Sequence, residues 1–268
     1  MAYEVLVLDI DGTVTNSDKI VTDATLKAIF AIQERGHKVV LASGRPTPGI
    51  LPIAKQLKLD EYGGYILSYN GAKIINCKTD EIIYNKTLPN SFLPKVFAAS
   101  KEFNTGLISY EEGAIISARE VDKYVELEAK INHLPVKVVD DFGSHIDFDV
   151  NKCLMTGDGE HMAKVEEIMK DRFGSELNIY RSEPFFLEIM PQHIDKAHSL
   201  GHLLDHLGLS REQMISCGDG YNDLSMIQYA GMGVAMANAQ QVVKEAADYI
   251  TLSNDEDGVA HVIKEFMI

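Results

Sequence analysis

The residue types that phosphoryl-transfer chemistry requires are grouped in a few short segments of the 268-residue chain, and the first is Asp9-Ile10-Asp11-Gly12-Thr13. The Asp9 carboxylate can act as a nucleophile and form an aspartyl phosphate. A second carboxyl at Asp11 can protonate the leaving oxygen and later deprotonate water. Gly12 permits a tight turn that brings the backbone close to the reacting group. For an isolated segment of this kind, the structural alternative is a strand end followed by a polar turn.

A second acidic segment, Gly218-Asp219-Gly220-Tyr221-Asn222-Asp223, lies near the other end of the chain. Mg²⁺ takes hard oxygen ligands and keeps several waters, so one or two carboxylates and a substrate phosphate are enough to hold it. Asp9 and Asp219 suit that role, with the backbone carbonyl of Asp11 as a third protein ligand. The alternative is an acidic, glycine-rich loop that caps the following helix.

Two further segments supply groups that can hold a phosphate. In Ser43-Gly44-Arg45, a hydroxyl and backbone N–H groups at a strand end can bind a phosphoryl oxygen, although a simple turn explains such a tripeptide equally well. Lys196 can neutralise charge on the transferring group, although a lone lysine at a helix start is usually only solvated. Asn222 could hold the phosphate or a neighbouring side chain, and Asp223 could orient Lys196.

These residues follow elements that alternate between strand and helix. Apolar runs predict strands and amphipathic segments predict helices. The expected strands are 3–8, 38–42, 65–68, 214–217, 233–235 and 249–251, and the expected helices are 22–35, 46–58, 196–207 and 259–266. Such alternation indicates parallel strands with right-handed crossovers. Because the carboxyl ends of parallel strands form the ligand crevice, Asp9, Ser43 and Asp219 should converge there.

The middle third follows a different pattern, with a hairpin and antiparallel pairs mixed with helices. Its expected strands are 73–77, 81–84, 114–118, 151–155, 177–180 and 185–189, and its expected helices are 93–103, 121–131 and 160–173. The sequence therefore predicts a parallel-sheet α/β core at 1–82 and 189–268, interrupted by an inserted α+β unit at 83–188.

Composition limits the possible partners and location. The formal net charge of −15 and the lack of a Lys/Arg cluster argue against nucleic-acid binding. No apolar run reaches the roughly 18 residues of a membrane span, and no secretory signal precedes the first strand. Cys77, Cys153 and Cys217 are widely spaced and suit buried thiols better than disulfides. We therefore expect a cytoplasmic protein with no nucleic-acid or membrane partner.

The sequence resembles the haloacid dehalogenase-like (HAD) hydrolase superfamily. DIDGT, SGR, the Lys of HIDKAHSL and GDGYND look like its four motifs, and an insert between the second and third resembles its Cof-type subfamily of sugar-phosphate phosphatases. Asn70-Gly71-Ala72 and Glu188–Pro191 are also similar to that subfamily. The resemblance covers nearly the whole chain, most strongly 1–72 and 188–257. One departure is Ala197, where a glycine often follows the motif lysine, and it should matter little because alanine is the better helix former.

The resemblance implies a Rossmann-like core with an inserted class IIB α/β cap that closes over the site. It implies Asp9 as nucleophile, Asp11 as acid and base, and Mg²⁺ on Asp9, Asp219 and the Asp11 carbonyl. The true dehalogenases lack a carboxylate at the position of Asp11, so its presence favours phosphate transfer. Phosphate would be bound by Ser43, Gly44, Lys196, Asn222 and the backbone at Ile10, with Thr13, Arg45, Asn70 and Asp223 in support.

The expected activity is therefore Mg²⁺-dependent hydrolysis of small phosphomonoesters, such as sugar phosphates or related metabolites. A mutase that moves phosphate between sugar positions and a non-catalytic binding module on the same fold stay open as alternatives. The sequence carries no signal for the physiological substrate or the oligomeric state. Arg45, Asn70, Arg181 and Glu188 are polar candidates for substrate contact near the predicted cleft, and a surface or hinge contact explains each of them at least as well. The scattered histidines, among them His133, His145, His193 and His198, are interpreted as structural or surface residues.

Overall fold

The computed structural model describes residues 3–111 and 113–268, and it consists of two compact units. The first unit comprises the chain up to Tyr84 together with Asp195–Ile268, and the second comprises Asn85–Ile194. The sequence placed these boundaries at 82/83 and 188/189. Both positions lie inside strands that continue further, β5 (Ile82–Asn85) and β11 (Phe186–Pro191).

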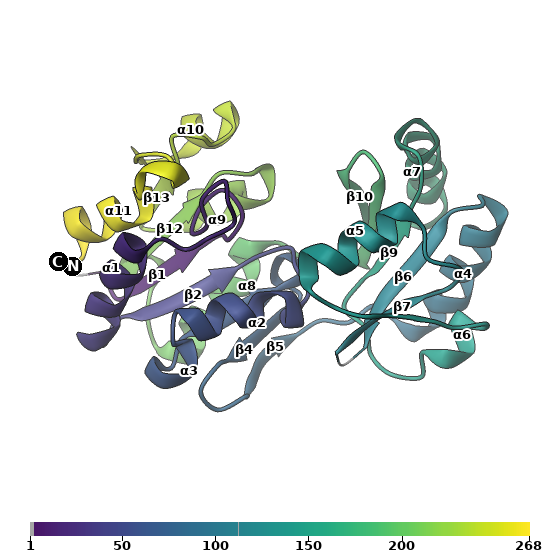
Figure 1. Ribbon diagram of the computed structural model, residues 1–268, viewed down its shortest axis with the longest axis horizontal. Helices are drawn as coiled ribbons and strands as arrows, with labels where there is room; N and C mark the ends of the chain where they lie inside the picture. Colours follow the sequence, from purple (N-terminus) through teal and green to yellow (C-terminus); the bar gives the residue numbers. More distant parts are fainter. Residues whose placement is uncertain (1–2, 112) are drawn as a thin grey trace. The chain divides into compact units, whose positions relative to one another are not determined.

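The first unit is built on an eight-stranded sheet in the order β14-β13-β12-β1-β2-β3-β4-β5 (Figure 1). Its remaining strands are β1 (Val5–Leu8), β2 (Lys38–Ala42), β3 (Tyr65–Ser68), β4 (Lys73–Asn76), β12 (Met214–Gly218), β13 (Met232–Ala235) and β14 (Tyr249–Ile250). From β14 to β3 every neighbouring pair is parallel, and β4 is antiparallel to β3. The prediction of a Rossmann-like parallel core is confirmed.

The strand order reverses at β1, which determines where a ligand can bind. Leu8 is in register with Leu41 of β2 on one side and with Cys217 of β12 on the other. The chain first builds the sheet from β1 toward β3 and later adds β12, β13 and β14 on the opposite side of β1. The carboxyl ends of β1, β2 and β12 therefore flank a topological switch point, where open α/β sheets bind their ligands.

Both faces of this sheet are buried under helices, as expected for parallel strands. Successive side chains of a strand point to opposite faces, so Leu6 and Leu8 join one apolar cluster while Val5 and Val7 join the other. Figure 1 shows α1 and α11 side by side, and both contribute to the cluster of Leu6 and Leu8. The helices are α1 (Asp23–Glu34), α2 (Thr47–Gln56), α3 (Leu59–Tyr62), α8 (Lys196–Leu207), α9 (Leu224–Tyr229), α10 (Gln241–Ala246) and α11 (Gly258–Phe266).

The second unit is an α+β fold with a six-stranded sheet in the order β10-β11-β9-β6-β7-β8. Its neighbours are antiparallel except for the parallel pair β7 and β8. The remaining elements are α4 (Leu93–Glu102), β6 (Gly106–Glu111), β7 (Ala114–Ser117), α5 (Lys123–Asn132), β8 (Val136–Val138), α6 (Phe142–His145), β9 (Cys153–Thr156), α7 (Gly159–Phe173) and β10 (Leu177–Glu183).

Two strands of this unit were not predicted from the sequence. The strand β6 contains a polar residue, Ser109, which is buried because its hydroxyl donates to the carbonyl of Lys152 at 2.9 Å. The strand β8 has only three residues, two of them exposed, so it carries no hydrophobic alternation. Short or polar strands of this kind become visible only when their hydrogen-bonding neighbours are known.

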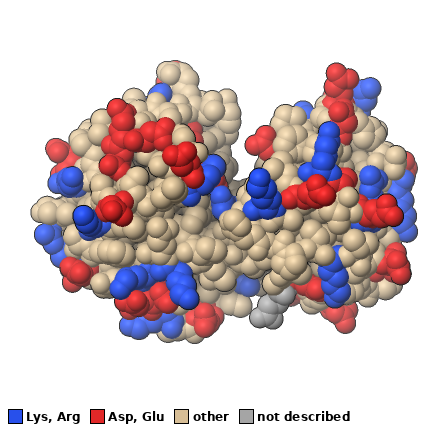
Figure 2. All heavy atoms as spheres, in the orientation of Figure 1, with Lys and Arg blue, Asp and Glu red and all other residues tan. Residues whose placement is uncertain are grey.

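The surface carries charges of both signs. On the face drawn in Figure 2, Lys and Arg side chains are interspersed with Asp and Glu. None of the helices within residues 3–111 and 113–268 combines the length and the apolar character that a membrane crossing requires.

Candidate active site

Three of the predicted site residues lie at the carboxyl edge of the first unit's sheet. Asp9 follows β1, Ser43 follows β2 and Asp219 follows β12. Asp9 and Ser43 are buried, and the Asp9 N–H donates to the Cys217 carbonyl at 3.0 Å. Gly12 has a φ of +83°, and a Cβ at this position would collide with the Asp219 carboxylate. The turn after β1 therefore requires glycine for its conformation and for its close approach to Asp219.

Lys196 is the first residue of α8, and its side chain is completely buried. Its Nζ donates to Asp9 Oδ1 at 2.7 Å, to Asp223 Oδ1 at 2.5 Å and to the carbonyl oxygen of Ala42 at 2.8 Å. These three acceptors match the three protons of the ammonium group. Burial alone would lower the pKa of Lys196, but the carboxylates of Asp223 and Asp9 outweigh it and raise the pKa above its usual value. Lys196 is therefore a permanent cation between two carboxylates.

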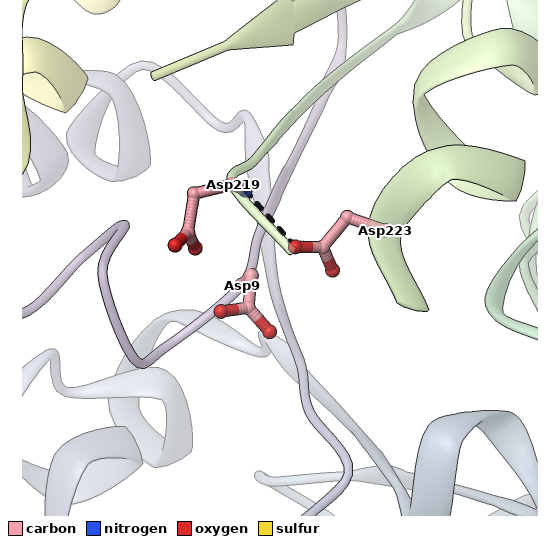
Figure 3. Close-up of side chains that lie close together, drawn as sticks. All are labelled: Asp9, Asp219 and Asp223. Atoms are coloured by element: carbon pink, nitrogen blue, oxygen red, sulfur yellow. Dashed lines mark hydrogen bonds between the residues drawn. The ribbon is translucent and has the colours of Figure 1, made fainter. Parts of the chain in front are cut away.

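Asp223 holds this arrangement in place from the loop after β12. Its Oδ1 accepts from Lys196, and its Oδ2 accepts from the backbone N–H groups of Asp219 at 3.0 Å and Gly220 at 2.9 Å. Figure 3 shows the bond from the Asp219 backbone. Because both of its oxygens are engaged, Asp223 orients Lys196 and the loop that carries Asp219.

The carboxyl groups of Asp9, Asp219 and Asp223 converge, with one oxygen of each within 4.8 Å of the others (Figure 3). Burial, followed by the charge of Asp223, raises the pKa of Asp9 well above its usual value and that of Asp219 to about 6. Three carboxylates and the Lys196 ammonium leave a local formal charge of about −2 when all are ionised. A divalent cation with hard-oxygen preference fits this donor set.

Asp9 and Asp219 are the residues best placed to hold such an ion. Thr13 Oγ1 donates to Asp219 Oδ1 at 3.1 Å and so orients that carboxylate. Asp223 belongs to the same cluster, but its oxygens already accept from Lys196 and the backbone. Coordination by the Asp11 backbone carbonyl stays a prediction. The neighbouring Ile10 carbonyl accepts from the Thr13 and Thr15 N–H groups, which shapes this turn.

The Asp11 side chain has partners that the sequence did not indicate. Arg45 Nε donates to its Oδ2 at 2.8 Å and Arg45 Nη2 to its Oδ1 at 2.7 Å, in a two-pronged pair, while Lys19 Nζ lies 3.0 Å from Oδ1. Burial would raise the pKa of Asp11, but the hydrogen bond and charge of Arg45 outweigh it and lower the pKa. In this arrangement Asp11 is an ionised carboxylate, ready to accept a proton.

Hydrogen bonds made by Asn70 connect the loops that follow β2, β3 and β12. Asn222 Nδ2 donates to Asn70 Oδ1 at 3.1 Å. Asn70 has a φ of +54°, an uncommon conformation for a residue other than glycine, and its N–H donates to the Ser43 carbonyl at 3.0 Å. A Cβ at Gly44 would lie 3.1 Å from Asn70 Oδ1, so the Gly44 backbone closely approaches the Asn70 side chain. The turn at Asn70 thus positions Asn222 next to the Ser43-Gly44 backbone.

Two of the proposed substrate contacts lie in the second unit and are engaged in ion pairs. Arg181 Nε donates to Glu166 Oε2 at 2.8 Å. Glu188 pairs with the buried Lys152, with Nζ 3.0 Å from Oε2, and accepts from Ser182 Oγ at 2.9 Å. Their predicted role in substrate binding therefore stays a prediction.

Comparison with known proteins identifies the family and the fold of this chain. A family model of haloacid dehalogenase-like hydrolases matches residues 6–263. A Bacillus subtilis 5-amino-6-(5-phospho-D-ribitylamino)uracil phosphatase, YcsE, is 30% identical over 265 residues, which cover 99% of this chain and 96% of that protein. A solved haloacid dehalogenase-like hydrolase from Bacteroides thetaiotaomicron is 48% identical, with a TM-score of 0.95 over 98% of this chain and 99% of that one.

A solved HAD subclass IIB sugar phosphatase is 27% identical, with a TM-score of 0.82 over 98% of both chains. The fold is thus shared with proteins of known structure along almost the full length of the chain. The resemblance found in the sequence is confirmed: the protein is an enzyme of the haloacid dehalogenase-like hydrolase family.

Proposed function

We propose that this enzyme is a Mg²⁺-dependent phosphatase that hydrolyses small phosphomonoesters through an aspartyl phosphate on Asp9. The observation that carries the proposal is the buried Asp9–Lys196–Asp223 chain at the topological switch point, with Asp219 beside it. A carboxylate fixed by a buried cation is held in one orientation toward its substrate, as nucleophilic catalysis requires.

The first step transfers the phosphoryl group to the enzyme. An oxygen of Asp9 attacks phosphorus, the bond from phosphorus to the ester oxygen breaks, and that oxygen takes a proton from the Asp11 carboxyl. Asn222 and the backbone near Ser43 bind the phosphoryl oxygens as charge develops on them, while Lys196, hydrogen-bonded to Asp9, supplies positive charge beside the nucleophile. When bound at Asp9 and Asp219, Mg²⁺ would supply positive charge for the phosphate.

The second step releases phosphate. The Asp11 carboxylate takes a proton from water as the water oxygen attacks phosphorus, and the bond from phosphorus to Asp9 breaks. Inorganic phosphate leaves, and both carboxyl groups return to their starting states. The observed pairing of Asp11 with Arg45 suits this second step, because it holds Asp11 ionised. In the first step Asp11 must carry a proton, so this pairing has to be exchanged or weakened when substrate binds.

We propose sugar phosphates and related metabolites as the substrate class and the cytoplasm as the location. The similarity to a subclass IIB sugar phosphatase supports the first. The first unit offers charged groups that select phosphate, whereas the organic part must be selected by other residues. We therefore propose a class of substrates, small phosphorylated metabolites, which should be tested as a panel of compounds.

The test is release of inorganic phosphate from sugar phosphates, nucleotides, other phosphorylated metabolites and an aryl phosphate, with Mg²⁺ or with chelator and no acceptor. We expect Mg²⁺-dependent release that Asp9→Asn abolishes, because an amide is a poor nucleophile. Asp18→Asn, a substitution of an exposed aspartate in the same loop region, is the matched control and should retain activity. Full activity in chelator would remove the metal from the mechanism. Transfer to an added sugar phosphate without net release would identify a mutase.

A further inference from the structure

The exposed side of α8 carries histidines at positions 198, 202 and 206, spaced by four residues. Two of them form a pair, since the Nε2 atoms of His198 and His202 lie 3.3 Å apart. Their rings are perpendicular, with centroids 4.9 Å apart. This pair is separate from the aspartate cluster and has no part in the reaction described above.

The pair is held by groups around it. Residues i and i+4 of a helix share one face, and the first turn of α8 is fixed by Asp195, whose Oδ1 accepts from the His198 N–H at 2.9 Å. The phenol ring of Tyr84 stacks on His202, with centroids 4.6 Å apart and an angle of 15°. The same ring meets the edge of His198 at 6.3 Å. On the opposite side, Leu200 and Leu203 are fully buried, so the helix is firmly packed.

The distance between the Nε2 atoms of His198 and His202 matches the distance between two imidazole ligands of one metal ion. Two imidazole nitrogens, each about 2.0–2.1 Å from one tetrahedral ion, lie about 3.3–3.4 Å apart. We propose that Nε2 of His198 and Nε2 of His202 form a second metal site, which takes a divalent transition ion such as Zn²⁺, Ni²⁺ or Cu²⁺. Water completes the coordination. Imidazole suits these ions, whereas Mg²⁺ prefers oxygen ligands, so the two sites discriminate between the two classes of ion.

A hydrogen bond between two neutral imidazoles is the competing explanation for the same distance. It requires one ring to donate and the other to accept, and an ion would replace the shared proton. The two explanations differ in what they predict for metal binding, because a hydrogen-bonded pair with no metal role has no preference for nickel over magnesium. Binding of the ion would also link the first two turns of α8, the helix that begins with Lys196, and should raise the melting temperature.

The experiment is titration of the full-length protein with Ni²⁺ and Zn²⁺ by calorimetry in excess Mg²⁺, which keeps the aspartate cluster occupied. Titration with Co²⁺ is followed by its visible absorption as a report of nitrogen ligation. We expect one ion to bind, with affinity at least tenfold lower in His202→Ala and in His198→Ala. His206→Ala, a substitution on the same helix one turn further, is the matched control and should bind as the unmodified protein does.

Asp219→Asn separates the two sites, because it should leave Ni²⁺ binding at the histidines unchanged. The melting temperature should rise with Ni²⁺ in the unmodified protein and in His206→Ala, but not in His202→Ala. Absence of Ni²⁺ binding, or binding that Asp219→Asn abolishes and His202→Ala leaves intact, would overturn the proposal. Equal losses in His202→Ala and His206→Ala would also overturn it, because they would indicate nonspecific imidazole binding.

Discussion

Replacement of Lys196 by methionine tests the electrostatic arrangement of the site through stability rather than turnover. The substitution keeps much of the side-chain volume and removes the only cation that Asp9 and Asp223 contact among the described residues. Lys196 has no solvent exposure, so water cannot replace its ammonium without rearrangement. Removing one partner of a buried ion pair costs about 3–5 kcal/mol, since it leaves uncompensated charge in the interior.

The loss in the free energy of unfolding caused by Lys196→Met should depend on pH, and the direction of this dependence follows from the pKa of Asp9. Its pKa is raised in the folded protein by burial and by Asp223, so the folded state binds more protons than the unfolded state. The contribution of Asp9 to the free energy of unfolding therefore falls as the pH rises from the pKa that Asp9 has in the unfolded chain toward its raised pKa in the folded protein. Without Lys196, which normally lowers the pKa of Asp9, that window extends to higher pH. The loss in the free energy of unfolding should be larger at pH 8 than at pH 5.

The assay is urea unfolding of the metal-free protein at both pH values, followed by circular dichroism. The double variant Lys196→Met/Asp9→Asn is the internal control. It removes one unpaired carboxylate and should recover about 1 kcal/mol or more relative to Lys196→Met at pH 8. A loss below about 1 kcal/mol at pH 8 would contradict the reasoning, and so would a loss independent of pH or a double variant with no recovery.

Three further predictions concern the same edge of the sheet. Because the pKa of Asp219 is about 6 in the metal-free protein, protons should compete with Mg²⁺ below that pH; calorimetry should show affinity falling by up to about tenfold per pH unit. Gly12→Ala should weaken Mg²⁺ binding and turnover together, since its Cβ would push the Asp219 carboxylate aside; unchanged Mg²⁺ affinity would contradict this. Asp11→Asn should lower kcat by about 10²–10⁴-fold, and steady-state kinetics that show a smaller effect would argue against its role in proton transfer.

The parts of the fold that the sequence predicted share one property: each is encoded by local pattern. Buried parallel strands are short apolar runs, and Asp9 and Asp219 stand directly after two of them. The sequence also suggested that Asp223 could orient Lys196, and the two side chains are in contact. Strand ends and helix starts are thus enough to bring together residues that are far apart in the sequence.

The parts that the sequence did not predict depend on side-chain direction and on partners in other loops. The pair between Arg45 and Asp11 joins the turns that follow the adjacent parallel strands β2 and β1, and no local sequence pattern encodes this contact. Lys19 joins the same carboxylate from an exposed position. His198 was interpreted as a surface residue, and its proximity to His202 could have been found from the four-residue spacing on an expected helix.

The charges at the site connect ion binding to nucleophilicity. Lys196 is shared between Asp9 and Asp223. Its charge lowers the pKa of Asp9, but burial and the neighbouring carboxylates raise it by more, so the pKa of Asp9 stays raised. A protonated carboxyl is a poor nucleophile, and positive charge placed nearby would favour the ionised form of Asp9. Asp219, itself with a raised pKa, is placed where a cation would supply that charge. We therefore expect a cation bound beside Asp9 and Asp219 to lower the pKa of Asp9 and so to favour the ionised form that nucleophilic attack requires.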